Sequence, residues 1–209
     1  MARRATLPTA LALLLLAAVP APAAPRSLPA PTPSAETEGE ARPLKAWLAL
    51  CDRLPAECAV DTAEARRVTL DQRTWDTIVT VNARLNRTIT AAPDPTHWGV
   101  DDRWDMAEDG RGDCEDYALA KRAALSAAGL PRRAMRMTVV RDERGEGHAV
   151  LTLITDRGDL ILDNRTSQIL PWRRTGYAFV KREDQDVTGW LYLADRGDPV
   201  LTSARRPAR

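Results

Sequence analysis

One helix in this chain of 209 residues has both of its ends marked in the sequence, and strand patterns follow it. The helix is predicted to begin after Gly112-Asp113, where an aspartate can accept hydrogen bonds from the first backbone N–H groups. It is predicted to end at Gly129-Leu130-Pro131, because glycine closes helices and proline cannot continue them. Strand patterns come next, at residues 135–141, 148–155, 159–163, 176–181 and 190–193. Helices first and strands afterwards predict an α+β fold, with N-terminal helices packed on an antiparallel β-sheet.

Two more helices are predicted nearer the N-terminus. Residues 43–50 form a short apolar segment, and residues 69–89 carry apolar side chains three and four positions apart, which is the helical period. Asn82 and Asn86 lie on or beside this apolar stripe. They either hydrogen-bond a neighbouring loop or form a partly buried polar pair at the helix edge.

A long loop is predicted between the last two helices. Residues 91–111 contain prolines, glycines and the tryptophans Trp98 and Trp104, without periodicity. Loops of this length inside a compact domain are often functional. The two tryptophans either wall a substrate groove or plug the core beneath the loop.

The first 23 residues have the three parts of a secretory signal peptide. Arg3 and Arg4 precede an apolar stretch, and Ala21-Pro22-Ala23 is a small-residue cleavage site. Prolines interrupt the apolar stretch, which is shorter than the roughly 20 residues that a membrane helix needs. We expect cleavage and a periplasmic or secreted protein; the alternative is an uncleaved membrane anchor.

The rest of the chain is predicted to hold one domain. Residues 24–42 are rich in proline, alanine and glutamate and have almost nothing to bury, so a disordered linker is expected there. Residues 43–195 are sufficient for one domain with a hydrophobic core, and residues 196–209 are expected to be a flexible tail. The formal net charge is +1 with both signs interspersed, so no nucleic-acid partner is expected.

Three cysteines in an exported chain suggest one disulfide and one free thiol. Cys51 and Cys58 lie close together in a turn-like segment, so we expect them to pair and Cys114 to be free. The alternative is that Cys51 and Cys58 are unpaired and buried. A zinc site is not expected, because two histidines and one free cysteine do not offer the usual ligand set.

Cys114, His148 and Asp163 are predicted to form a Cys-His-Asp catalytic set. Cys114 lies on the first turn of the predicted helix, where unpaired backbone N–H groups favour a thiolate. His148 opens one strand and Asp163 closes the next. If residues 155–158 form a four-residue loop, the two side chains share a face, with α-carbons roughly 7–8 Å apart. The alternative is an inert cysteine, a structural histidine and a turn-forming aspartate.

Three carboxylates, Asp113, Glu115 and Asp116, surround Cys114 and should raise the pKa of its thiol. Asp113 and Asp116 have the spacing of a capping box at the helix start, which would give them a structural role. The other explanation is a bound cation, because hard oxygen donors packed together suit calcium.

Several segments together resemble the bacterial transglutaminase-like cysteine peptidases. These segments are Gly112-Asp-Cys-Glu-Asp-Tyr117, Gly147-His-Ala-Val-Leu151 and Leu162-Asp-Asn164, with Cys51…Pro55…Cys58, Trp98-Gly99 and Pro171-Trp172 in addition. The resemblance spans about residues 45–193. It implies a papain-like/transglutaminase-like fold with Cys114 as nucleophile, His148 as base and Asp163 as the residue that orients the histidine.

The best understood members of this family are periplasmic proteases that cut large surface adhesins, and a membrane receptor that responds to cyclic-di-GMP holds them in check. Their calcium ligands flank the nucleophile and correspond here to Asp113 and Glu115. The resemblance therefore implies calcium as a cofactor, a protein substrate such as a surface adhesin, and a membrane receptor as a regulatory partner. The chain departs from that branch in its Cys51/Cys58 segment and in Gly145-Glu-Gly-His148.

The predicted function is that of an exported cysteine endopeptidase, which forms an acyl-enzyme on Cys114 and releases it to water. A transglutaminase or amidase could use the same three residues, since it differs only in the nucleophile that resolves the acyl-enzyme. A third hypothesis is a non-catalytic binding module that keeps the fold. The presence of all three residues favours an enzyme.

Overall fold

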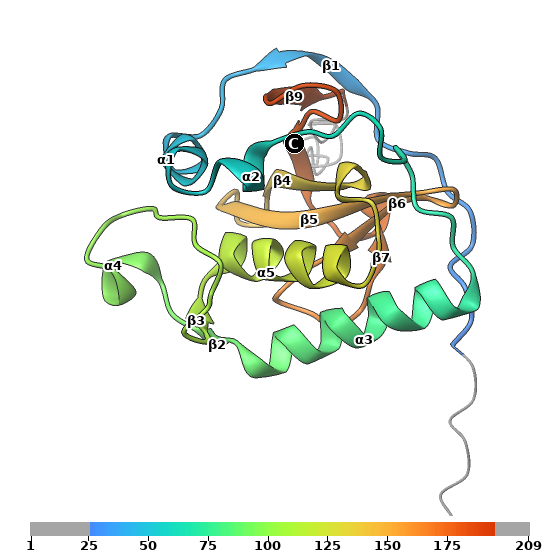
Figure 1. The fold of residues 1–209 in the computed structure, drawn as a ribbon, viewed down its shortest axis with the longest axis horizontal. Coiled ribbons are helices and arrows are strands. Elements are labelled where there is room, and N and C mark those ends of the chain that lie inside the picture. The colour runs from blue at the N-terminus through green and yellow to red at the C-terminus, as the bar shows by residue number, and fades with distance from the viewer. Residues whose placement is uncertain (1–25, 195–209) are drawn as a thin grey trace, which may run out of the picture.

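The computed structural model describes residues 26–194 (Figure 1). The predicted signal peptide, residues 1–23, and the predicted tail, residues 196–209, lie outside the described residues. Between residues 26 and 194, no helix combines the length and the apolar character needed to cross a membrane. The elements, in chain order, are β1 (Thr37–Ala41), α1 (Lys45–Arg53), α2 (Pro55–Cys58), α3 (Gln72–Thr88), β2 (Thr90–Ala91), α4 (Asp94–His97), β3 (Arg111–Gly112), α5 (Cys114–Ala127), η1 (Arg132–Ala134), β4 (Met135–Arg141), β5 (Gly147–Thr155), β6 (Gly158–Leu162), β7 (Leu170–Pro171), η2 (Trp172–Arg174), β8 (Ala178–Glu183) and β9 (Trp190–Leu193).

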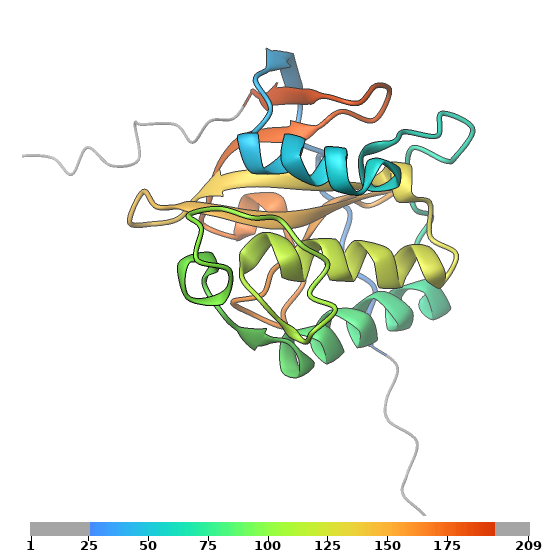
Figure 2. The same cartoon turned by 60° about the vertical axis from the view of Figure 1, so that its left-hand side comes forward.

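Seven strands form one antiparallel sheet in the order β1-β9-β8-β4-β5-β6-β7. Helix α5 packs on the central strands β4 and β5, and α3 packs on α5. Figure 2 shows these two helices one beneath the other on the same side of the sheet. The predicted α+β fold, with helices against an antiparallel sheet, is confirmed.

The central strands bury apolar side chains on both faces. Met137 and Leu151 belong to the large core that includes the helices, whereas Val140 and Val150 belong to a smaller cluster with Trp172. The alternation follows the two-residue period of a strand. Burial on both faces makes β4 and β5 a rigid base for the side chains at their ends.

Residues 26–42 are not a disordered linker, which corrects the prediction. Strand β1 pairs with β9 at the edge of the sheet, although most of its side chains are exposed. Upstream of β1, Thr32 N–H donates to the carbonyl of Arg157 at 3.0 Å, and the Trp172 indole donates to the carbonyl of Pro33 at 2.8 Å. These contacts use the main chain, which composition does not reveal. The folded unit therefore begins upstream of the predicted boundary at residue 43.

Cys51 and Cys58 form the predicted disulfide, with 5.5 Å between their α-carbons, and Cys114 is free. The bridge joins α1 to α2 and therefore fixes the turn between them.

The predicted loop at residues 91–111 contains one short helix, α4, and its ends meet in the parallel pair β2–β3. Trp104 is buried and its ring lies edge-on to that of Trp190, 6.2 Å between centroids, so it packs in the core, and it also lines a pocket beside Cys114. Trp98 is 37% exposed, beneath the guanidinium of Arg103. Because β3 runs directly into α5, this loop is held beside the start of α5.

Candidate active site

Cys114 occupies the first position of α5, as predicted, and Asp113 and Asp116 form the predicted capping box. The Cys114 sulfur accepts a hydrogen bond from the backbone N–H of Ala149 at 3.4 Å. The thiol itself donates to Glu115 Oε2 at 3.1 Å. Burial, followed by the charge of Glu115, raises the pKa of Cys114 well above its ordinary value. The sulfur is therefore placed beside β5, but its carboxylate neighbour opposes ionisation.

The predicted register between β5 and β6 is confirmed, since Ile154 pairs with Asp159 and Leu151 pairs with Leu162. This register brings His148 and Asp163 to the same face. His148 Nε2 lies 2.9 Å from Asp163 Oδ1, and both side chains are buried. The structure thus brings together all three residues of the predicted catalytic set. His148 bonds to Asp163, and Ala149, the residue directly after His148, bonds to the Cys114 sulfur.

Asp163 is held in its ionised form. Burial by itself would raise the pKa of Asp163, but hydrogen bonds from His148, Tyr177 and the Arg165 N–H outweigh burial and lower it. The Arg165 N–H donates to Oδ1 at 3.0 Å and the Tyr177 hydroxyl donates to Oδ2 at 2.5 Å. An anionic carboxylate at this place stabilises a protonated imidazole.

Of the two predicted roles for the asparagines of α3, the structure shows the first, which is hydrogen bonding to a neighbouring loop. Asn82 Nδ2 donates to the carbonyl of Ser167 at 3.2 Å, and Asn86 Nδ2 donates to the carbonyls of Asp163 at 2.8 Å and Thr166 at 2.9 Å. Helix α3 therefore fixes the loop that begins with the proposed orienting aspartate.

The acidic residues near Cys114 include some that are distant from it in the sequence. Asp94 and Asp102, from the 91–111 loop, each offer an oxygen within 4.8 Å of one on Glu115. Asp94 also forms such a group with Asp113 and Asp116. Burial, followed by the charge of Asp113, raises the pKa of Glu115 to about 9, and burial raises the pKa of Asp116 to about 7. The crowding of like charges is energetically costly, and a cation would relieve it.

Asp116 differs from the other carboxylates near Cys114 in the hydrogen bonds that its oxygens accept. Both Asp116 oxygens accept backbone hydrogen bonds, from Asp105 at 2.6 Å and from Asp113 at 3.2 Å. In contrast, Asp94 Oδ1 and Asp113 Oδ1 are buried without a hydrogen-bond partner in the described structure. Buried carboxylate oxygens without donors are rare in proteins and suit a hard cation such as calcium. The residues that fit it are Asp94, Asp102, Asp113 and Glu115.

Sequence reasoning missed Asp94 and Asp102. Both lie in the long loop, with nothing in the local pattern to distinguish them from its other acidic residues. Only the β2–β3 pair, which closes the loop, brings them to the start of α5.

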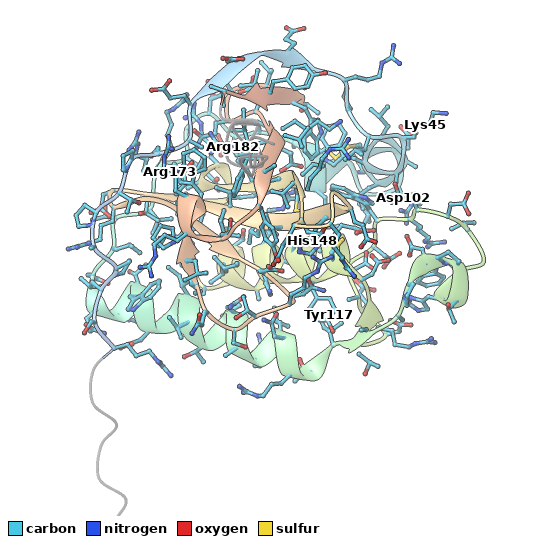
Figure 3. The ribbon with its side chains drawn as sticks, turned by 180° about the vertical axis from the view of Figure 1, so that it is seen from behind. Lys45, Asp102, Tyr117, His148, Arg173 and Arg182 are labelled. Atoms are coloured by element: carbon cyan, nitrogen blue, oxygen red, sulfur yellow. A yellow bond between two sulfur atoms is a disulfide. The ribbon has the colours of Figure 1, made fainter. Side chains whose placement is uncertain are left out.

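A pocket of about 200 Å³ opens onto Cys114. Its lining includes the apolar side chains of Leu44, Trp104 and Val139 and the polar side chains of His148 and Asp102. Figure 3 labels His148 and Asp102. The pocket can accommodate a small apolar group next to the sulfur.

The sequence matches the model of one protein family, described as bacterial transglutaminase-like cysteine proteinase, over residues 37–198. Among solved structures, calcium-bound LapG of Legionella pneumophila is 30% identical, with a TM-score of 0.49 over 59% of this chain and 71% of that one. EGTA-treated LapG of the same organism is also 30% identical, with a TM-score of 0.48 over 58% and 67%. No curated protein sequence matches this chain. Since the family model covers most of the sequence, this chain belongs to the bacterial transglutaminase-like cysteine proteinases.

Proposed function

We propose that this protein is an exported cysteine endopeptidase in which Cys114 is the nucleophile, His148 the general base and Asp163 the orienting carboxylate. The observation that carries the proposal is the contact between the Cys114 sulfur and the N–H of Ala149. Ala149 directly follows His148, and the His148 side chain in turn bonds to Asp163. A thiol at a helix start beside a histidine and carboxylate pair is the arrangement that nucleophilic catalysis by cysteine needs.

The first chemical step forms the acyl-enzyme. His148 Nε2 is engaged by Asp163, so Nδ1 is the nitrogen that accepts the proton of the Cys114 thiol. The sulfur bonds to the carbonyl carbon of the substrate. The Cys114 N–H, which lies in the first turn and has no acceptor within the helix, is placed to donate to the resulting oxyanion. The C–N bond then breaks, and the imidazolium returns its proton to the leaving amine.

The second step releases the product. His148 takes a proton from water as the water oxygen bonds to the acyl carbon. The C–S bond then breaks and the imidazolium returns the proton to the departing sulfur, which regenerates the Cys114 thiol and neutral His148. The ionised carboxylate of Asp163 stabilises the imidazolium in both steps.

The four carboxylates Asp94, Asp102, Asp113 and Glu115 would hold a calcium ion beside the nucleophile. When bound, the ion supplies positive charge that offsets the effect of Glu115 and Asp113 on the thiol. The solved LapG structures, one of them calcium-bound, support this part of the proposal. The buried, unpaired oxygens on Asp94 and Asp113 support it independently.

Export and substrate complete the proposal. The signal-peptide pattern of residues 1–23 and the disulfide both suit an oxidising compartment outside the cytosol, the periplasm or beyond. The substrate would be an exported or surface protein, such as an adhesin, and a membrane receptor would regulate its cleavage. The small apolar pocket at Cys114 suits a substrate with small residues near the cut.

A thiol-directed peptide probe tests the proposed nucleophile. We expect the mature protein to be labelled once, and mass spectrometry to place the label on Cys114, which is its free cysteine. Labelling should disappear after Cys114→Ala. A probe attached to any other side chain would contradict the proposal. Incorporation of an added amine into the peptide, with no free carboxylate product, would indicate transamidation instead.

Removal of calcium should lower both activity and thermal stability. A ligand that binds only the folded state at about 100 times its Kd stabilises it by about 2.7 kcal/mol, which corresponds to roughly 5–10 °C in Tm for a domain of this size. Calorimetry and peptide hydrolysis with and without chelator measure the two effects.

Paired variants locate the ion. Asp102→Asn removes one charged ligand and should raise the calcium concentration needed for half-maximal activity by about tenfold, which corresponds to about 1.4 kcal/mol of binding free energy. Asp101→Asn, the same change at a neighbouring residue that belongs to none of the acidic groups found among the described residues, should leave that concentration unchanged. Equal Tm and activity with and without chelator would remove calcium from the proposal.

A further inference from the structure

Tyr177 contacts both residues that are proposed to assist Cys114. It lies immediately before β8, and its hydroxyl donates to Asp163 Oδ2 at 2.5 Å. Its ring meets the ring of His148 edge-on, with 5.5 Å between centroids and an angle of 69° between planes. The mechanism described above gives Tyr177 no chemical step.

The hydroxyl of Tyr177 determines how the Asp163 carboxylate can turn. Oδ1 accepts from His148 and from the Arg165 N–H, so without Tyr177 the carboxylate would be held at one oxygen only. A second donor at Oδ2 fixes the plane of the carboxylate and keeps Oδ1 directed at the histidine. Burial and the hydrogen bond to Asp163 raise the pKa of Tyr177 to about 12, so its hydroxyl keeps its proton at neutral pH.

The main chain of Asp163 is anchored separately from its side chain. Its carbonyl accepts hydrogen bonds from Lys121 Nζ at 2.9 Å and from Asn86 Nδ2 at 2.8 Å. Lys121 is fully buried and lies about two turns after Cys114 on the same helix, so α5 carries the sulfur and also holds the backbone of Asp163. Removing the Tyr177 hydroxyl would therefore free the carboxylate but leave the backbone of Asp163 in place.

We propose that Tyr177 is a positioning residue of this active site, which holds the Asp163 carboxylate through its hydroxyl and the His148 ring through the edge-on contact between the two rings. The inference rests on the proposed roles of Cys114, His148 and Asp163. Tyr177 is then a fourth side chain of the site, and it orients the other side chains. Mutation can measure the contribution of its hydroxyl separately from that of its ring.

Tyr177→Phe removes the hydroxyl and keeps the ring. We expect kcat to fall about 10- to 100-fold with KM nearly unchanged, the range given by losing one hydrogen bond to a charged group. The acidic limb of the pH profile of kcat/KM should move to higher pH, because the Tyr177 hydroxyl helps to lower the pKa of Asp163. The other polar groups that face Asp163, namely His148, Arg165, Lys121 and Asn86, stay in place.

Tyr117→Phe is the matched control. The Tyr117 hydroxyl donates to the carbonyl of Ile89 at 2.6 Å in the core, and so the variant loses a buried hydrogen bond that does not touch Asp163 or His148. It should lower Tm by as much as Tyr177→Phe does, yet keep the parental kcat and the parental acidic limb. A parental kcat in Tyr177→Phe, or an equal loss of kcat in both variants, would overturn the inference.

A second readout does not depend on turnover. The chain has two histidines, so the Nε2 proton of His148 can be assigned by NMR in the calcium-loaded protein. In Tyr177→Phe this proton should exchange with water faster than in the parent, and in Tyr117→Phe it should not. If the parent protein does not hydrolyse peptides, the proposed function fails, and the exchange rate alone then decides the role of Tyr177: unchanged exchange refutes it.

Discussion

Replacing Cys114 with alanine should abolish peptide hydrolysis, with a loss of about 10⁴-fold or more in kcat/KM, while the fold remains intact. The other two cysteines form the disulfide, so no second free thiol can replace the nucleophile. Cys114→Ser should be nearly as inactive, because a hydroxyl ionises far less readily than a thiol. Initial rates on a fluorogenic peptide, at saturating calcium, measure the effect.

The stability of these variants can be anticipated from the contacts of the side chain. The side chain is small; its sulfur accepts one long hydrogen bond, from Ala149, and its thiol donates one to Glu115. Tm should therefore change by only a few degrees, corresponding to about 1 kcal/mol or less. Ser126→Ala, a change of similar size at the other end of α5, should leave both the rate and the fold unaffected. Parental turnover in Cys114→Ala would disprove its proposed role.

The two histidines of the chain should respond very differently to alanine. His148→Ala should lower kcat/KM by about 10⁴-fold, because it removes the base that accepts the thiol proton and leaves Asp163 without its partner. His97 also has an acidic partner, Asp109, 2.8 Å from its Nε2, which the sequence did not reveal. Asp109 is about half exposed, and its pair lies in the 91–111 loop.

His97→Ala should change kcat/KM by less than about fivefold, equivalent to about 1 kcal/mol, because the His97 imidazole contacts Asp109 within the loop and does not line the pocket at Cys114. Saturating calcium is needed in this comparison, because the same loop carries Asp94 and Asp102. Steady-state kinetics of both variants against one peptide decide between the histidines. The reverse order of damage would mean that His97, not His148, is the base.

The acidic residues around Cys114 divide into two groups once their contacts are known. The sequence presents a capping box and a cation site as competing explanations. Asp116 uses both of its oxygens to hold the backbone at the start of α5, and so it is explained by capping. Asp113 takes part in the capping box and still has a buried oxygen without a hydrogen-bond partner among the described residues. Asp94, in the 91–111 loop, has a buried oxygen of the same kind. The two explanations therefore apply together, to different oxygens of the same cluster.

Much of the site follows from local sequence because its determinants are local. The start of α5 is fixed by an aspartate and by the glycine before it, whose position leaves no room for a side chain beside Asp116. The hairpin between β5 and β6 has a short turn, and a strand alternates its side chains with a period of two, so His148 and Asp163 share a face once the register is known. The disulfide closes a short segment. Each of these features is fixed by residues close together in the chain.

What the tertiary structure decided depends on contacts between distant segments. Strand β1 exists because its backbone pairs with β9, and backbone hydrogen bonds leave no trace in a sequence of exposed prolines and glutamates. Asp94 and Asp102 reach the nucleophile only through the closed loop. Tyr177 reaches Asp163 from the position just before β8, and Lys121 reaches it from α5. The sequence by itself determined which residues carry the proposed chemistry. Only packing determined which residues orient and neutralise them, because a side chain acquires these partners when distant elements meet.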